Sequence, residues 1–185
     1  PARKAAPVDE NQGALAIEVE GPRRPKPKDP ELHLQREALK AALQAPHLAG
    51  PHFDSLPGDA FTEPAYLELH QGLQAAGGAS CGLAGPALFD AVKRNCQHQV
   101  VQSLVTELSV EPMHARTEPD LRYVESLIAA PNKSVVARQI ADIKSRLQRL
   151  SPLENADDYR ALFGDLVAME QYHKALGEQA SGSLA

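Results

Sequence analysis

Apolar residues recur every three to four positions along most of the chain after residue 30, which is the spacing of one helix face. The first helix is expected to begin with Asp29 as its N-cap and to end before Pro46. A short apolar turn is expected over residues 47–56. The pattern therefore predicts that regular structure begins at about residue 30.

Helix-capping and helix-breaking residues divide the next hundred residues into short helices. Thr62 is the expected cap of one helix, which ends at Gly77 and Gly78. Further helices are expected from residue 86, from residue 99, and after the capping segment 117–120. We expect residues 30–130 to form a compact bundle of five or six short helices, which makes the fold class all-α.

Two longer periodic segments over residues 134–178 predict an antiparallel helical hairpin after the bundle. Pro131 is expected to kink or break the helix that precedes it. Asn155 is the expected cap of the second hairpin helix, and residues 179–185 are expected to form a flexible tail. A hairpin covers only one face of each helix, so its remaining apolar side chains either pack on the bundle or bind a partner.

Residues 1–29 differ in character from the rest of the chain. Prolines alternate with positive charges over residues 21–28, which predicts an extended, solvated, basic linker. Residues 15–19 are strand-like, as at the end of a preceding domain. Residue 1 is proline rather than methionine. Together these features indicate a fragment of a longer protein, joined by this linker to an upstream domain.

Composition narrows the function classes. The net charge of -5 argues against direct nucleic-acid binding, which needs a basic surface. Hydrophobic residues make up 43% of the chain and aromatic residues only 4%, which favours close helix packing. No apolar run reaches the about 18 residues of a membrane span. With two cysteines and no signal peptide, the sequence indicates a cytoplasmic protein without disulfides.

Candidate catalytic groups are sparse. The seven histidines include no pair at i, i+4, so no metal site is predicted. Cys81 lies in a glycine-rich loop, and Cys96 is the type of small residue that fills a helical core. Neither has a histidine at a recognisable motif spacing, and no phosphate-binding glycine pattern occurs. We therefore expect no catalytic residue and no cofactor in this chain.

Three segments carry a resemblance to a known family. Residues 35–48, residues 61–69 with Tyr66, and residues 146–170 with Tyr159 and Phe163 resemble the C-terminal helicase-binding domain of bacterial replicative DNA primases. The resemblance covers about residues 30–180 and rests on diffuse apolar patterns. It implies a helical bundle followed by a terminal hairpin. It also implies a parent DNA primase, a primer-making RNA polymerase, whose zinc-binding and polymerase motifs do not occur in this chain.

The resemblance implies a non-catalytic docking role that recruits primer synthesis to the replication fork. The hairpin is expected to bind the N-terminal domain of the hexameric replicative helicase. The residues expected to make this contact are Tyr159, Arg160, Phe163, Leu166, Met169, Glu170, Tyr172 and Leu176. In some family members a basic pocket on the first bundle helix binds the acidic C-terminal tail of single-stranded-DNA-binding protein. The matching residues here are Arg36 and Lys40.

Two other interpretations stay open from the sequence. The first part of the resemblance is shared with the N-terminal domain of the replicative helicase, so the chain is alternatively such a domain or a helicase-loader domain. A motor domain following the bundle and hairpin would favour this alternative. A small cytosolic enzyme is the third interpretation, and metal binding or a reactive Cys81 would favour it.

Overall fold

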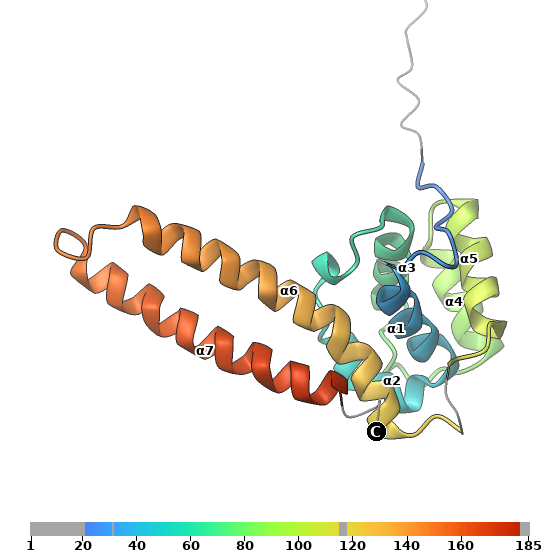
Figure 1. Ribbon diagram of the computed structural model, residues 1–185. Coiled ribbons are helices and arrows are strands. Elements are labelled where there is room, and N and C mark those ends of the chain that lie inside the picture. The colour runs from blue at the N-terminus through green and yellow to red at the C-terminus, as the bar shows by residue number, and fades with distance from the viewer. Residues whose placement is uncertain (1–20, 31, 115–117, 182–185) are drawn as a thin grey trace, which may run out of the picture.

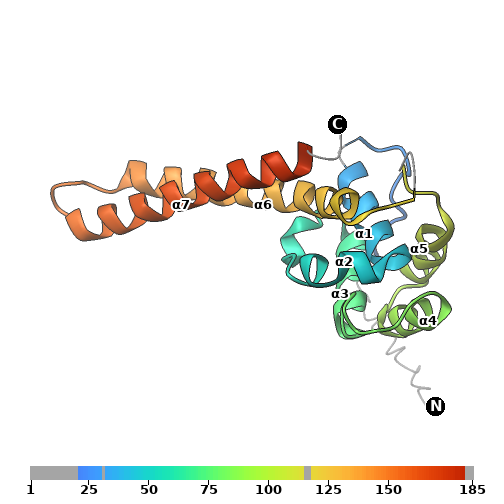
Figure 2. The ribbon, with the colours of Figure 1, turned by 90° about the horizontal axis from the view of Figure 1, so that it is seen from below.

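The computed structural model describes residues 21–30, 32–114 and 118–181, and within these ranges it contains helices and no strands. Helices α1 to α5 gather at one end of the molecule, and α6 and α7 extend from it side by side (Figures 1 and 2). The all-α fold class is thus confirmed. The elements are α1 (His33–Gln44), α2 (Pro46–Asp54), the 3-10 turn η1 (Gly58–Ala60), α3 (Pro64–Ala75), α4 (Pro86–Asn95), α5 (Gln99–Val110), α6 (Leu121–Arg149) and α7 (Ala156–Ser181). No helix in the described part is long and apolar enough to cross a membrane.

Helix α1 is the centre of the bundle. It contacts α2, α3, α5 and α6, and its Leu39 and Leu43 are fully buried. Ala38, Ala41 and Ala42 are also fully buried, and their small side chains let neighbouring helices approach closely. Because α1 is covered on nearly every side, its polar residues are buried as well. Arg36 and Lys40 are 1% and 0% exposed.

Several helix ends differ from the sequence prediction. Helix α1 begins at His33 rather than at Asp29, whose carbonyl accepts a turn hydrogen bond from the Leu32 amide at 3.2 Å. Residues 46–54 form a helix interrupted at Gly50, where a turn was expected. Thr62 does not cap α3, because its backbone N–H and its hydroxyl both bond the side chain of Gln35.

The expected end of α3 is confirmed. Helix α3 stops at Ala75, and Gly77 and Gly78 follow with φ of 103° and 77°. The Asp54 carboxylate accepts hydrogen bonds from the Ala79 and Ser80 amides at 2.6 and 3.0 Å. A Cβ at position 78 would lie 2.6 Å from that carboxylate, so both the backbone angle and the space require glycine there.

Helix α6 runs unbroken through Pro131 for 29 residues, so the predicted break is wrong. Proline removes one backbone hydrogen bond, but packing on both sides supports the helix. Val124, Ile128 and Val135 belong to the bundle core, while Ala129 and Val136 pack in a second cluster with Leu176 of α7. One helix is therefore shared by the bundle and the hairpin. Helix α6 begins at Leu121, and Asp120 is its N-cap, whose side chain accepts a hydrogen bond from the Tyr123 amide at 2.8 Å. Thr117, part of the capping segment expected from the sequence, lies outside the described residues.

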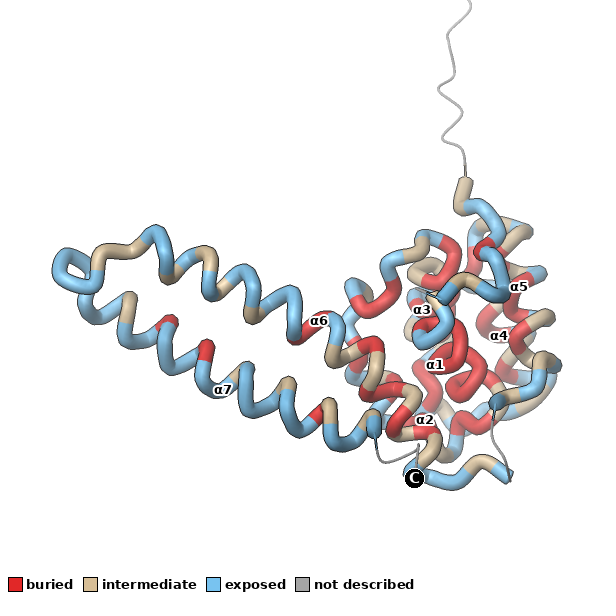
Figure 3. The backbone as a smooth tube through the Cα atoms, viewed as in Figure 1, coloured by how far each residue is buried: buried red, intermediate tan, exposed pale blue. Residues whose placement is uncertain are grey.

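Helix α7 lies along α6 in the opposite direction. Lys144 forms an ion pair with Glu170 at 2.8 Å. At the end of the hairpin nearer the bundle, Lys133 lies beside Gly177. Near the same end, Asn132 donates to the Tyr172 hydroxyl at 2.9 Å. The helix continues to Ser181, so residues 179–181 are helical where a tail was expected. Burial is dense in the bundle and sparse along the hairpin (Figure 3).

Part of the predicted linker is described. Residues 21–29 have no helix or strand, but Pro25 is buried and Arg24 forms an ion pair with Glu107 of α5. An extended, fully solvated stretch was expected, but the Asp29 amide closes a turn on the Lys26 carbonyl at 3.2 Å, and the stretch lies against the bundle. The strand-like residues 15–19 lie outside the described residues.

Candidate functional site: the helical hairpin

The inner face of α7 is covered by α6. Leu162, Leu166 and Leu176 are 7%, 9% and 5% exposed and share one side of the helix, with Leu176 in the cluster that packs against α6. Leu166 and Leu176 were both expected to contact a partner. In this structure they hold the hairpin together, so their side chains are not available to a partner unless the hairpin opens.

One flank of α7 carries an apolar stripe of the half-buried Tyr159 and the exposed Phe163 and Val167. Tyr159, Phe163 and Val167 follow one another at i, i+4 and i+8, which places them on the same side of the helix. Phe163 is 51% and Val167 40% exposed, and the Tyr159 and Phe163 rings stack with centroids 6.5 Å apart. We call these three residues the tip stripe, because they lie toward the loop that joins the two helices. Val167 was missed from the sequence, although its spacing from Phe163 would have included it.

The other flank of α7 borders an open groove between the two hairpin helices. Its volume is about 640 Å³, and it is lined by Arg138, Gln139, Asp142, Ile143, Arg146, Asp165, Ala168 and Met169. Tyr172, 47% exposed, follows Asp165 by seven residues and Ala168 by four, so it continues this flank. The predicted residues Met169 and Tyr172 thus lie on a different side of α7 from Tyr159 and Phe163.

Charged residues border the tip stripe. Arg160 pairs with Asp157 at 3.1 Å, and Glu170 pairs with Lys144 at 2.8 Å. All four side chains are at least half exposed, so these pairs contribute little to stability and exchange easily for contacts with a partner. Arg138 bonds the backbone carbonyl of Asp59 and thereby links the hairpin to η1.

Arg36 and Lys40 are buried rather than presented in a surface pocket. The Arg36 guanidinium bonds Glu107 at 2.6 Å, Glu111, and the Tyr66 hydroxyl. Lys40 bonds Glu37 at 2.6 Å, Glu111 at 3.3 Å, and the Pro112 carbonyl at 2.7 Å. Hydrogen bonding to Arg36 lowers the pKa of Glu111. The expected binding pocket is therefore already filled by carboxylates of this chain.

The two cysteines differ in their surroundings. Cys96 is buried at the end of α4, and burial raises the pKa of its thiol to about 11. A thiol with so high a pKa is a poor nucleophile at neutral pH. Cys81 is half-buried in the loop between α3 and α4.

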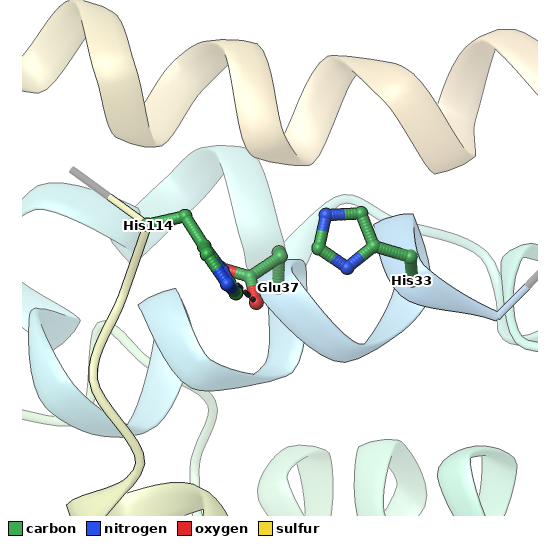
Figure 4. Close-up of side chains that lie close together, drawn as sticks. All are labelled: His33, Glu37 and His114. Carbon is green, nitrogen blue, oxygen red and sulfur yellow. Dashed lines mark hydrogen bonds and ion pairs between the residues drawn. The ribbon is translucent and has the colours of Figure 1, made fainter. Parts of the chain in front are cut away.

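One group of metal-ligating side chains does form in the bundle. His33, Glu37 and His114 bring their ligand atoms within 4.8 Å of one another (Figure 4). This group was not predicted from the sequence, because the seven histidines include no pair one helical turn apart. A histidine and a glutamate at that spacing, His33 and Glu37, were the signal in the sequence. The third residue comes from a distant segment.

The fold is an all-helical bundle with a projecting helical hairpin, and comparison with known proteins identifies its class. The model of the family described as DNA primase DnaG DnaB-binding matches residues 35–162. This chain belongs to that family.

Known DNA primases are similar to this chain. The DNA primase of Mycolicibacterium smegmatis is 49% identical over 160 residues, which is 86% of this chain and 25% of that protein. The DNA primase of Streptomyces coelicolor is 32% identical over 190 residues, covering 97% of this chain and 30% of that protein. The chain therefore spans about a quarter to a third of the length of these relatives.

A solved structure has the same fold. The helicase-binding domain of primase from Mycobacterium tuberculosis matches with a TM-score of 0.75 and 47% identity, covering 82% of this chain and 94% of that one. Among the three interpretations of the sequence, these similarities favour the primase domain over a helicase or loader domain and over a small enzyme.

Proposed function

We propose that this chain is the non-catalytic domain through which a bacterial DNA primase binds the N-terminal domain of the hexameric replicative helicase. By this contact the parent protein, a cytoplasmic enzyme that makes RNA primers, would be recruited to the replication fork. The observation that carries the proposal is the projecting hairpin, whose α7 leaves large apolar side chains exposed on a chain of this family. Exposed apolar surface of this kind is typical of a protein-binding site.

The tip stripe is the proposed centre of the contact. Aromatic side chains are favoured anchors at protein interfaces, and the stacked Tyr159 and Phe163 rings offer two of them with little conformational freedom to lose. Val167 extends the stripe toward the bundle. Arg160 and Glu170, whose own ion pairs are exposed, would set the orientation at the edge of the interface.

Tyr172 and the half-buried Met169, which also packs against the cluster of Ala129, Val136 and Leu176, form a second proposed contact on the groove side of α7. A partner that reaches both flanks must straddle the exposed back of the helix, because the inner face between the flanks is covered by α6. Leu166 and Leu176 act in this proposal by fixing the two helices against each other. They would affect binding only through the shape of the hairpin.

A pair of matched substitutions tests the proposal. Phe163→Asp introduces a charge into the tip stripe, and Val110→Asp does the same at a residue of α5 that is 77% exposed but far along the chain from the hairpin. We expect Phe163→Asp to weaken binding to the cognate helicase by about 10-fold or more, as for an interface anchor, with Val110→Asp close to the unmodified chain. Isothermal titration gives the affinities, and circular dichroism verifies that both variants keep their helicity. Equal binding by both variants would refute the tip stripe as the contact.

The acidic C-terminal tail of single-stranded-DNA-binding protein is a second proposed partner, at Arg36 and Lys40. Because Glu111 already bonds both residues, a tail carboxylate would have to replace it. Glu111 is the plausible group to give way, since its side chain is 27% exposed while Arg36 and Lys40 are almost fully covered. Glu111→Gln is therefore expected to increase the affinity for an acidic tail peptide. Unchanged or weaker binding would argue against this site. Direct nucleic-acid binding is not part of the proposal, given the net charge of -5.

A further inference from the structure

Three metal-ligating side chains converge on the bundle away from the hairpin. His33 and Glu37 lie one turn apart on α1, and His114 comes from the segment that follows α5 (Figure 4). Their ligand atoms lie within 4.8 Å of one another, and the His33 and His114 rings meet edge to face with centroids 5.5 Å apart. Both histidines are exposed, so an ion has access to the group from solvent.

The carboxylate at the centre of this group is buried and only partly bonded. Glu37 is 1% exposed. Its Oε1 interacts with the Lys40 ammonium at 2.6 Å and with His114 Nδ1 at 3.1 Å. Its Oε2 is buried and has no hydrogen-bond partner among the residues that the structure describes. A buried carboxylate oxygen without a partner is unfavourable, and a bound cation would supply the missing interaction.

We propose that His33, Glu37 and His114 bind a divalent transition-metal ion of the zinc type, with water completing the coordination. Two imidazoles and one carboxylate are a donor set that zinc accepts. Ligand atoms around a tetrahedral zinc ion lie about 3.3 Å apart, given bonds of about 2.0–2.1 Å. The ligand atoms, now up to 4.8 Å apart, must therefore approach by up to about 1.5 Å, and His114 must turn from its hydrogen bond with Glu37 to the ion. The Lys40 ammonium beside Oε1 repels a cation, so the site is expected to bind the ion reversibly rather than permanently.

Such an ion would connect two parts of the chain. His33 and Glu37 belong to the central bundle helix, whereas His114 lies in the connection between α5 and α6. Binding would fix that connection against α1 close to where α6 begins. At an ion concentration about 100 times Kd, the folded state is favoured about 100-fold by mass action. The inference does not depend on helicase binding, because no residue of the hairpin surface takes part in it.

The experiment is a metal titration of the 185-residue chain, freed of any affinity tag and stripped with a chelator. We expect one Zn²⁺ per chain by isothermal titration, Co²⁺ absorption bands in the visible region, and a rise in thermal midpoint with Zn²⁺. His33→Ala and His114→Ala should each weaken binding at least about 10-fold, as loss of one of three ligands does. His47→Ala removes an exposed histidine elsewhere in the bundle and should bind as the unmodified chain does.

Three results would overturn the inference. The first is no Zn²⁺ binding by the unmodified chain at millimolar concentration. The second is unchanged affinity in His33→Ala and His114→Ala. The third is loss of binding on Cys81→Ser, which would assign the ion to a thiol site instead. Circular dichroism of each variant ensures that a loss of binding is not a loss of fold, and Glu37→Gln gives a further variant that keeps the size of the buried side chain.

Discussion

The bundle and the hairpin differ in how completely the chain covers its own side chains. In the bundle even Arg36, Glu37 and Lys40 are almost fully buried, and each has an oppositely charged partner. In the hairpin two helices cover one face of each other, and Phe163 and Tyr172 are left about half exposed. The bundle therefore resembles a finished protein interior, whereas the hairpin resembles one side of an interface. Mutations should accordingly affect mainly stability in the bundle and mainly binding in the hairpin.

The largest effect is expected from Leu39→Ala in the bundle. Leu39 is fully buried on the central helix, so its truncation leaves a cavity and should lower the free energy of unfolding by about 2–5 kcal/mol. Urea denaturation followed by circular dichroism measures this change. A loss below about 1 kcal/mol would mean that the bundle interior is much looser than its burial indicates.

A smaller, pH-dependent effect is expected from Arg36→Met. Arg36 holds the pKa of Glu111 below its ordinary value, so the ionised carboxylate stabilises the fold above the ordinary glutamate range, and this stability is lost as pH falls through the lowered pKa. The variant should lose about 1–3 kcal/mol at pH 7, because Glu107 and Glu111 lose their hydrogen bonds to the buried guanidinium and keep only Arg24 and Lys40 as partners.

The same variant should show a weaker dependence of stability on pH between neutral and acidic conditions. Urea titrations at a series of pH values test this. Parallel stability profiles for the variant and the unmodified chain would contradict the assigned role of Arg36.

Leu176→Ala should have a moderate effect confined to the hairpin. Leu176 is 5% exposed but packs in a small cluster, with only Ala129 and Val136 as buried neighbours. We expect a loss of about 1–2 kcal/mol, below the usual range for a buried leucine, because few atoms surround the site. Amide hydrogen exchange should rise in α7 and remain unchanged in α1. Faster exchange in α1 would mean that the two regions unfold together.

The smallest effect is expected from Lys144→Ala. Its ion pair with Glu170 joins two side chains that are about half exposed, so the loss in stability should stay within about 0.5 kcal/mol. If Glu170 orients the partner as proposed, its release should alter helicase binding more than stability. A larger loss of stability than of affinity would contradict that assignment.

The sequence predicted where helices occur better than where they begin and end. Apolar periodicity was sufficient to predict α3, α4 and α5, because this periodicity depends only on the local geometry of a helix. Thr62 was expected to cap a helix, but its hydroxyl instead accepts a hydrogen bond from the side chain of Gln35, 27 residues away. Pro131 was expected to interrupt a helix that tertiary packing keeps intact. These errors arise from contacts between distant segments, which a local pattern does not contain.

The candidate surface was predicted less well for a related reason. Periodicity identified the apolar residues of α7, but not which of them turn toward α6, so buried Leu166 and Leu176 were grouped with exposed Phe163. Arg36 and Lys40 were expected to form an accessible pocket for an acidic tail, but both are buried. Their spacing of four residues matches that of Glu107 on α5 and Glu111 directly after it, but only the packing of α1 against α5 brings the two pairs together.

The continuity of α6 has a mechanical consequence. Since the helix passes from the bundle core into the hairpin without a break, there is no flexible joint at Pro131. From Val135, the last core residue on this helix, about 14 residues lead to its end, a lever of about 21 Å at 1.5 Å per residue. A tilt of about 10° at Val135 would move the far end of α6 by about 4 Å, given that length. Small adjustments of packing in the bundle core therefore change the direction of the hairpin. A change inside the bundle becomes a displacement at the loop end of the hairpin.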